Sequence, residues 1–92
     1  MPVYLVTYDL IAKKGEVRDY QPLYEVLENF PNFEALYSVY LVEANSGADI
    51  ESVISPVLRD SDRYFITRLR KSEYRSRAAK GINAWLAAHP PA

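Results

Sequence analysis

Residues 2–10 read PVYLVTYDL, and this stretch decides the fold. It is dominated by valine, tyrosine, leucine and threonine, which are residue types that favour β-strands. Side chains alternate along a strand, so the odd-numbered residues share one face and the even-numbered residues share the other. Both faces are largely apolar. The stretch is therefore predicted to be a central strand that is covered on both sides.

Asp9 closes this strand and is the only charged side chain among the first twelve residues. A carboxylate at the C-terminal end of a central strand lies at the rim of the sheet, on a rigid element. Such a residue can cap a turn, and it can also take part in chemistry. Both interpretations of Asp9 stay open at this point.

The bulk composition excludes several classes of site. A chain of 92 residues is predicted to form a single domain, 1–92, and is too short for two independent cores. Cysteine is absent and His89 is the only histidine, which excludes a disulfide scaffold, a thiolate metal site and a Ser-His-Asp triad. No apolar run reaches the roughly 20 residues that span a bilayer, and no signal-peptide pattern is present. We expect a cytoplasmic protein with no membrane partner.

Two helices are predicted from apolar spacing in the first two thirds of the chain. The first covers residues 20–30, where apolar side chains follow helical spacing. The second begins at a capping box formed by Ser46 and Asp49. Pro56 lies inside this second helix and is expected to distort its last turn.

The remaining elements are two short strands, a fourth strand and a last helix. Residues 33–44 are too long for one typical strand and are predicted to divide near Tyr37–Ser38. Residues 63–69 alternate as a strand, and residues 72–89 are predicted to form a helix weakened at Gly81.

The order β-α-β-β-α-β with an added C-terminal helix predicts an α+β fold of the ferredoxin-like sandwich type. That plan has strand order 4-1-3-2 and places the first two helices on the same face of the sheet. The opposite face then needs a cover: the last helix, a partner subunit or RNA. A second copy of a small chain commonly covers such a face, so we expect a homodimer.

Charge is distributed unevenly along the chain. Residues 1–62 contain eleven acidic and four basic residues, a net charge of −7, whereas residues 63–80 contain seven basic and one acidic residue, a net charge of +6. The basic stretch can be a phosphate-binding surface or a solvated edge. The candidate nucleic-acid-binding residues are Lys13, Lys14, Arg68, Arg70, Lys71, Arg75 and Arg77.

The predicted topology brings oxygen ligands to one edge of the sheet. The first strand runs antiparallel to strands three and four, so Asp9 is expected near Ser38, Asp60 and Asp62. Carboxylates and hydroxyls without imidazoles suit Mg²⁺ or Mn²⁺ shared with a substrate phosphate. For Asp60 and Asp62 the turn interpretation is favoured, because aspartate and serine are common turn residues.

The same residues carry a family resemblance. VYLVTYDL, together with YSVYL at residues 37–41, resembles the CRISPR-associated protein 2 family. DRYFI at residues 62–66 and AWL at residues 84–86 are similar to a side branch, the SinR-like proteins. The resemblance covers essentially the whole chain.

The resemblance implies a homodimer packed through its sheets, with Asp9 matching the metal-binding carboxylate of the family and Tyr8 and Ser38 in supporting positions. It implies either a metal-dependent endonuclease that acts on RNA or double-stranded DNA, or a non-catalytic DNA-binding scaffold. A toxin-like ribonuclease of the same fold is a variant of the first activity.

One further hypothesis is an RNA-recognition sheet that uses Tyr4, Tyr8 and Tyr40 as stacking platforms. The competing interpretation places these three tyrosines in the core or at a dimer interface. The chain lacks the glycine-aromatic pattern of that recognition fold, which favours the core interpretation.

Overall fold

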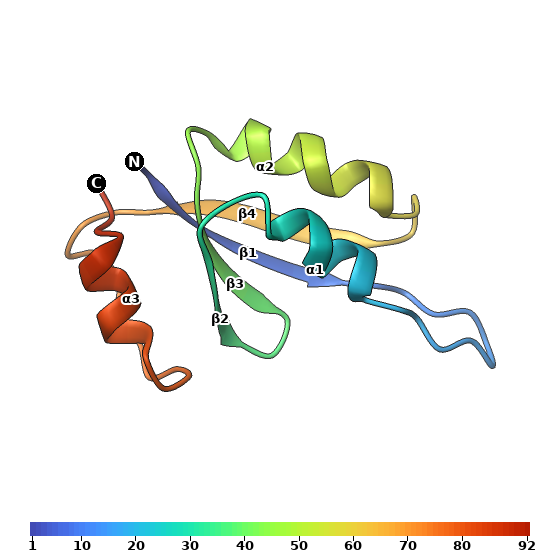
Figure 1. The fold of residues 1–92 in the computed structure, drawn as a ribbon. Coiled ribbons are helices and arrows are strands. Elements are labelled where there is room, and N and C mark those ends of the chain that lie inside the picture. The colour runs from blue at the N-terminus through green and yellow to red at the C-terminus, as the bar shows by residue number, and fades with distance from the viewer.

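The computed structural model describes the whole chain, residues 1–92. Its elements, in chain order, are β1 (Val3–Asp9), α1 (Gln21–Leu27), β2 (Asn32–Leu36), β3 (Val39–Glu43), α2 (Gly47–Ile54), a 3₁₀ turn η1 (Ser55–Val57), β4 (Arg63–Leu69) and α3 (Ile82–Ala88). The four strands form one antiparallel sheet in the order β2-β3-β1-β4, which is 4-1-3-2 when read from β4 (Figure 1). The predicted α+β class is confirmed, and β1 is an interior strand.

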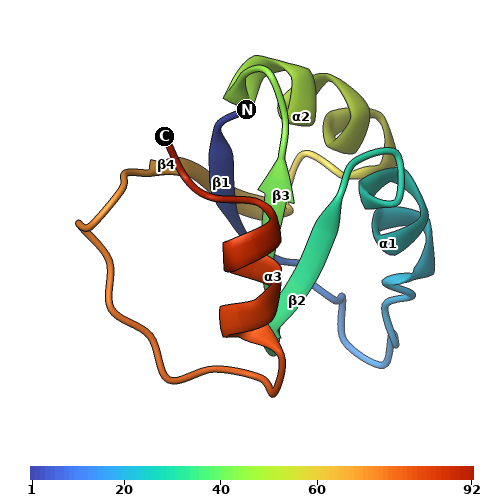
Figure 2. The ribbon, with the colours of Figure 1, turned by 60° about the vertical axis from the view of Figure 1, so that its left-hand side comes forward.

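Helices lie on both faces of this sheet. On one face, α1 and α2 pack side by side over the larger core, to which β1 contributes Val6 and Tyr8 (Figure 1). On the other face, α3 lies across β2 and β3 and buries Val3 and Leu41 with its own Leu86 (Figure 2). The first strand therefore belongs to two cores, as its two apolar faces predicted. The larger core contains Val6, Tyr8, Leu23, Leu27, Tyr40, Val42, Ala44, Ile50 and Ile54.

The local turn signals are confirmed. Tyr37 and Ser38 separate β2 from β3, and Ser38 takes a positive φ of 61° to make this tight connection. The Ser46 side chain accepts a hydrogen bond from the Asp49 backbone N–H at 3.1 Å and so caps α2. Pro56 lies in the 3₁₀ turn that ends this helix, which is the distortion expected there.

The predicted last helix, residues 72–89, is longer than α3 in the structure. Residues 70–81 form an irregular connection between β4 and α3, and helix begins only at Ile82. The Ala79 N–H donates to the Ala35 carbonyl of β2 at 2.9 Å rather than to a helical carbonyl. Lys71 and Arg75 would be like charges four residues apart in a helix, and few apolar side chains in this connection reach the core. Gly81 has φ of 96° and marks the boundary.

A smaller difference concerns the length of α1. The first helix covers Gln21–Leu27, shorter than the predicted 20–30, because its last residues tighten into a turn before Pro31. None of the three helices has the length and apolar character needed to cross a bilayer.

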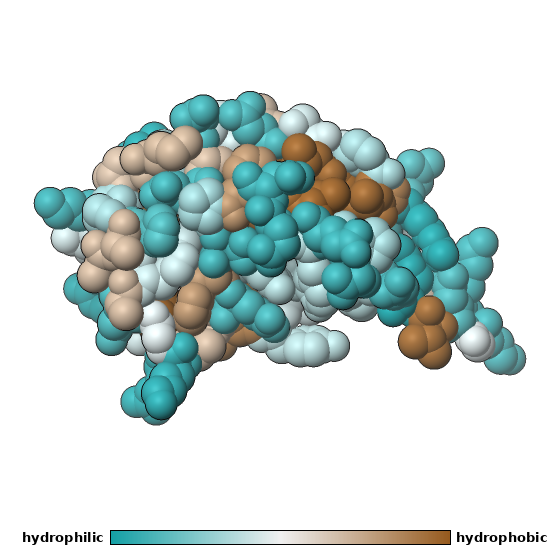
Figure 3. Space-filling view, in the orientation of Figure 1, coloured by the Kyte–Doolittle hydropathy of each residue, from teal (hydrophilic) through white to brown (hydrophobic).

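Most of the surface seen in Figure 3 is hydrophilic, and its hydrophobic residues gather where α1 meets the second half of α2.

Candidate nucleic-acid interface

Asp9 lies at the C-terminal end of β1, directly across from Arg63 of β4 in the strand register. Its side chain is exposed and forms no ion pair. It lines an open depression of about 200 Å³ together with Thr7, Arg63 and Phe65. The Thr7 hydroxyl donates to the Ser38 carbonyl at 3.0 Å, so the β2–β3 turn borders the same end of β1. Asp9 is thus a free carboxylate on a rigid strand end.

The carboxylate of Asp62 is already paired with an arginine. Its carboxylate accepts two hydrogen bonds from the Arg18 guanidinium, at 2.5 and 2.7 Å, and others from the backbone N–H groups of Ile11 and Arg59. These bonds hold the pKa of Asp62 well below its ordinary value, with Arg18 as the largest cause. The turn interpretation of Asp62 is confirmed, because every oxygen position already has a donor.

The acidic cluster expected beside Asp9 is consequently not assembled within one chain. Asp62 turns toward Arg18, and Asp60 is exposed in the turn before β4 without an ion pair. Nowhere does the chain bring three or more acidic or histidine side chains together as a metal site would need. Ser38 lies at the same end of β1 as Asp9, through the Thr7–Ser38 hydrogen bond, and the carboxylate of Asp62 is already paired with Arg18.

The predicted basic residues fall into two separate groups. Lys13 and Lys14 lie in the loop that follows β1, which projects from one end of the molecule in Figure 1. Arg68 lies near the end of β4, and Arg70 and the basic residues after it lie in the β4–α3 connection, at the opposite end of the molecule. The structure therefore does not join the lysine pair to the arginines in one patch.

The basic residues of β4 and the connection are all exposed. Arg70 is the only one of them near a carboxylate, 4.0 Å from Glu73, and both of these side chains reach into solvent. The Arg75 guanidinium donates to the Tyr74 carbonyl at 2.8 Å, which leaves its charge unneutralised. The free basic residues are Arg63, Arg68, Lys71, Arg75, Arg77 and Lys80.

Tyr8 does not lie on the Asp9 face of the sheet. Its ring is buried under α1 and packs against Tyr20, Tyr24 and Tyr40 at centroid separations of 5.8 to 6.3 Å. Its hydroxyl has no hydrogen-bond partner, and burial raises the pKa of Tyr8 above its ordinary value. Burial, followed by the charge of Glu34, raises the pKa of Tyr40 to about 12.

These burials decide between the two interpretations of the tyrosines. Tyr8 and Tyr40 belong to the core beneath α1 and α2, and Tyr4 packs against the same core. None of the three is presented on an open sheet face as a stacking platform. The core interpretation of these residues is confirmed.

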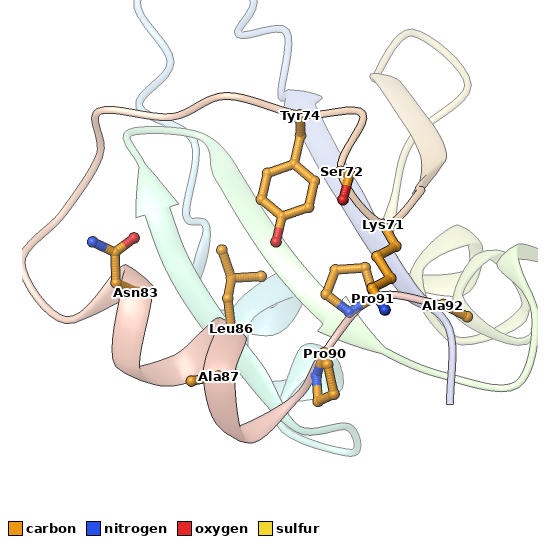
Figure 4. A pocket seen from close by; sticks show the side chains of 9 residues that line it. All are labelled: Lys71, Ser72, Tyr74, Asn83, Leu86, Ala87, Pro90, Pro91 and Ala92. Carbon is orange, nitrogen blue, oxygen red and sulfur yellow. The ribbon is translucent and has the colours of Figure 1, made fainter.

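Two cavities border the β4–α3 connection. An open groove of about 750 Å³ lies between the start of the connection, α3 and the C-terminal tail, and Tyr74 points into it toward Leu86 (Figure 4). The Lys71 N–H donates to the Ala92 carbonyl at 3.1 Å and so holds the tail there. A narrower apolar pocket of about 200 Å³ lies between the sheet and residues 74–78.

Sequence analysis missed a set of exposed apolar residues on the α3 side of the sheet. Phe65 and Leu36 are 64% and 52% exposed, and Tyr37 in the adjoining turn is 87% exposed. Alternation along β4 does place Phe65 on the face opposite α2. The pattern alone could not show that α3 stops short of this part of the sheet.

The chain matches no protein-family model, and no solved structure matches it. Its function must therefore be inferred from the residues and geometry described above.

Proposed function

We propose that this protein binds the phosphate backbone of nucleic acid through the basic segment, defined as residues 63–80. The observation that carries this proposal is a net charge of +6 concentrated in one strand and its following connection. Six of the seven basic side chains have no carboxylate partner, and all seven are exposed. Lysine and arginine that neutralise phosphates supply most of the affinity for nucleic acid.

The alternative of a merely solvated edge is less consistent with the charge arrangement. The chain has twelve acidic residues and a net charge near zero, so carboxylates are available to pair with these arginines. Arg18 and Arg59 each hold one with two short hydrogen bonds, whereas the basic segment has only Glu73. Uncompensated charge of one sign attracts polyanions over a Debye length.

The wider assignment that we propose is a ferredoxin-like protein related to the CRISPR-associated protein 2 family, in its SinR-like branch. The β-α-β-β-α-β order, the 4-1-3-2 reading of the sheet and the motifs around Asp9 and Ser38 support it. In this assignment the protein is a nucleic-acid-binding or assembly scaffold. A homodimer is part of the same proposal.

A metal-dependent endonuclease is the second candidate, and Asp9 is the residue that favours it. The carboxylate is exposed, unpaired and fixed on β1. Mg²⁺ and Mn²⁺ prefer several oxygen ligands, however, and one chain offers only this carboxylate because Asp62 is held by Arg18. The residues of a single chain therefore do not fit such an ion without a second copy or a substrate phosphate.

The experiment that tests phosphate binding is fluorescence anisotropy of labelled oligonucleotides over a range of salt concentrations. We expect log K to fall linearly with log salt, and Arg77→Ala to make the slope shallower by about 1. Lys14→Ala removes the same charge from the distant loop and should leave the slope unchanged. Absence of binding at about 50 mM salt, or an equal loss in both variants, would overturn the basic segment as the interface.

Incubation of the same oligonucleotides with Mg²⁺ or Mn²⁺ tests the second candidate. Cleavage by the wild type that Asp9→Ala abolishes would establish the endonuclease. Cleavage that Asp9→Ala leaves unchanged would remove Asp9 from the mechanism, and binding without cleavage would support the scaffold.

A further inference from the structure

We infer that the nucleic acid is single-stranded and that its unpaired bases lie on the open part of the sheet, against Phe65. This inference rests on the proposed function and names its substrate class. It begins with the sheet face that α3 leaves uncovered. There the strand register aligns four side chains in one row across all four strands: Leu36, Val39, Thr7 and Phe65.

Three of the four side chains in this row are apolar, and all four are at least partly accessible. Phe65 and Leu36 stand at its two ends and are both more than half exposed, while Thr7 and Val39 between them are partly exposed. Tyr37 follows Leu36 in the β2–β3 turn and is almost fully exposed. The rings of Phe65, on the sheet, and Tyr37, in the adjoining turn, provide surfaces on which bases of any identity can stack.

Guanidinium groups border this row on both sides. Arg63 shares the depression lined by Thr7 and Phe65. On the other side, Arg75 and Arg77 line the apolar pocket of about 200 Å³ that Leu36 and Val39 also line. None of these three arginines is in an ion pair. Apolar and aromatic surface between free cations is the arrangement that binds single strands, because bases stack while phosphates are neutralised.

A duplex would use this surface poorly. Its bases are stacked inside the helix, so only phosphates would reach the arginines, and Phe65 would stay in contact with water.

A second copy of the chain is the other occupant to consider. The charged residues bordering the row are Asp9, Arg63, Arg75 and Arg77, a surplus of two positive charges for each copy. Pairing two such faces would bring arginines together, whereas a polyanion complements them. We therefore assign this face to nucleic acid and place the contact of the proposed homodimer elsewhere on the chain, which departs from the sheet-to-sheet packing that the resemblance implies.

The test measures anisotropy of labelled oligothymidylate and oligouridylate of about 16 nucleotides and of a duplex of equal length, with Phe65→Ala. We expect the wild type to prefer the single strands and the variant to bind them about tenfold more weakly, with duplex binding unchanged. Phe65→Tyr should retain the wild-type affinity because it retains a ring. Val17→Ala, which removes an exposed apolar side chain from the loop after β1, should change nothing.

The outcomes separate this inference from the proposed function. If Arg77→Ala weakens binding while Phe65→Ala matches Val17→Ala, the single-strand assignment is overturned and phosphate binding stands. If no oligonucleotide binds, both fail. If the wild type sediments as a dimer that Phe65→Ala dissociates, the face belongs to a second copy and the inference is overturned. Tighter binding of either single strand than of the duplex supports the inference. The ratio of the affinities for oligothymidylate and oligouridylate distinguishes DNA from RNA.

Circular dichroism and thermal melting of Phe65→Ala serve as the control for folding. Most of the Phe65 ring is outside the core, so its removal should leave the melting temperature close to that of the wild type. Phe65→Leu, which keeps apolar contact and loses the ring, then distinguishes stacking from general hydrophobic contact. Wild-type single-strand affinity in Phe65→Leu would contradict base stacking.

Discussion

Arg18 and Arg59 are each held by a carboxylate through two hydrogen bonds, whereas only one of the seven basic residues of the basic segment, Arg70, lies near a carboxylate. The Arg18–Asp62 pair is enclosed, with 8% and 0% of its side chains exposed. The Arg59–Glu16 pair lies nearer the surface, with 47% and 28% exposed. Together the two pairs tie the loop after β1 to the turn that precedes β4.

The difference between these two sets of arginines follows from burial. A guanidinium removed from water needs a partner, because an isolated buried charge is strongly unfavourable. An exposed guanidinium keeps its hydration and can stay unpaired until an anion arrives. We therefore infer that arginine stabilises the fold in the first set and is available for binding in the second.

The largest effect is expected from breaking the enclosed pair. Asp62→Asn removes the charge that faces Arg18 and leaves that guanidinium enclosed without its counterion. We expect the free energy of unfolding to fall by about 3 kcal/mol, measured by urea denaturation at neutral pH. The matched control is Glu73→Gln, which removes the acid beside exposed Arg70 and should leave the midpoint unchanged. Equal midpoints for both variants would contradict the distinction between the two sets.

Low pH should break the Arg18–Asp62 pair in the wild-type protein, because it protonates the Asp62 carboxylate. The pKa of Asp62 lies below its ordinary value in the folded protein, and Arg59 lowers the pKa of Glu16 to about 2. A carboxylate of this kind contributes stability that is fully present above its unfolded pKa of about 4 and is lost as pH falls through the folded value. We expect the gap in melting temperature between wild type and Asp62→Asn to be constant near neutrality and to narrow below about pH 4. A difference in melting temperature that widens in acid would contradict a lowered pKa of Asp62 in the folded protein.

Most of the fold could be predicted because its signals are local. The alternation around Asp9, the division at Ser38 and the cap at Ser46 are each specified within a few neighbouring residues. The region 72–81 could not be predicted in this way. Its composition permits a helix, and only the limited apolar surface available to it in three dimensions leaves it irregular.

The candidate site was predictable in composition and less so in arrangement. The uneven charge is visible in the sequence, and so is Asp9 at a strand end. The pairing of Asp62 with Arg18 joins residues 44 positions apart, so no local pattern could show that this acid is already occupied. Phe65 was overlooked because its exposure depends on how far α3 reaches across the sheet.

The unpaired set can be tested by removing two of its members together. Arg75→Ala with Arg77→Ala should leave the urea midpoint at the wild-type value, because neither side chain holds a carboxylate. Nucleic-acid affinity at low salt should fall, by about tenfold, and the salt slope should become shallower by about 2. Unchanged affinity would show that these arginines are solvated and unused. A large fall in stability would place them with the structural set.

The smallest loss of stability is expected from breaking the Arg59–Glu16 pair near the surface. This loss shows whether burial or pairing determines how much an arginine contributes to stability. Glu16→Gln removes the negative charge and one of the two acceptor oxygens that face Arg59, and Asp62→Asn does the same to Arg18. If burial decides, the melting temperature of Glu16→Gln should fall far less than that of Asp62→Asn, because water compensates an exposed guanidinium. The small difference from wild type should also disappear at about 1 M salt, where surface charges are screened, while the effect of Asp62→Asn persists. Equal losses that resist salt in both variants would mean that pairing itself, and not enclosure, distinguishes the structural arginines from those of the basic segment.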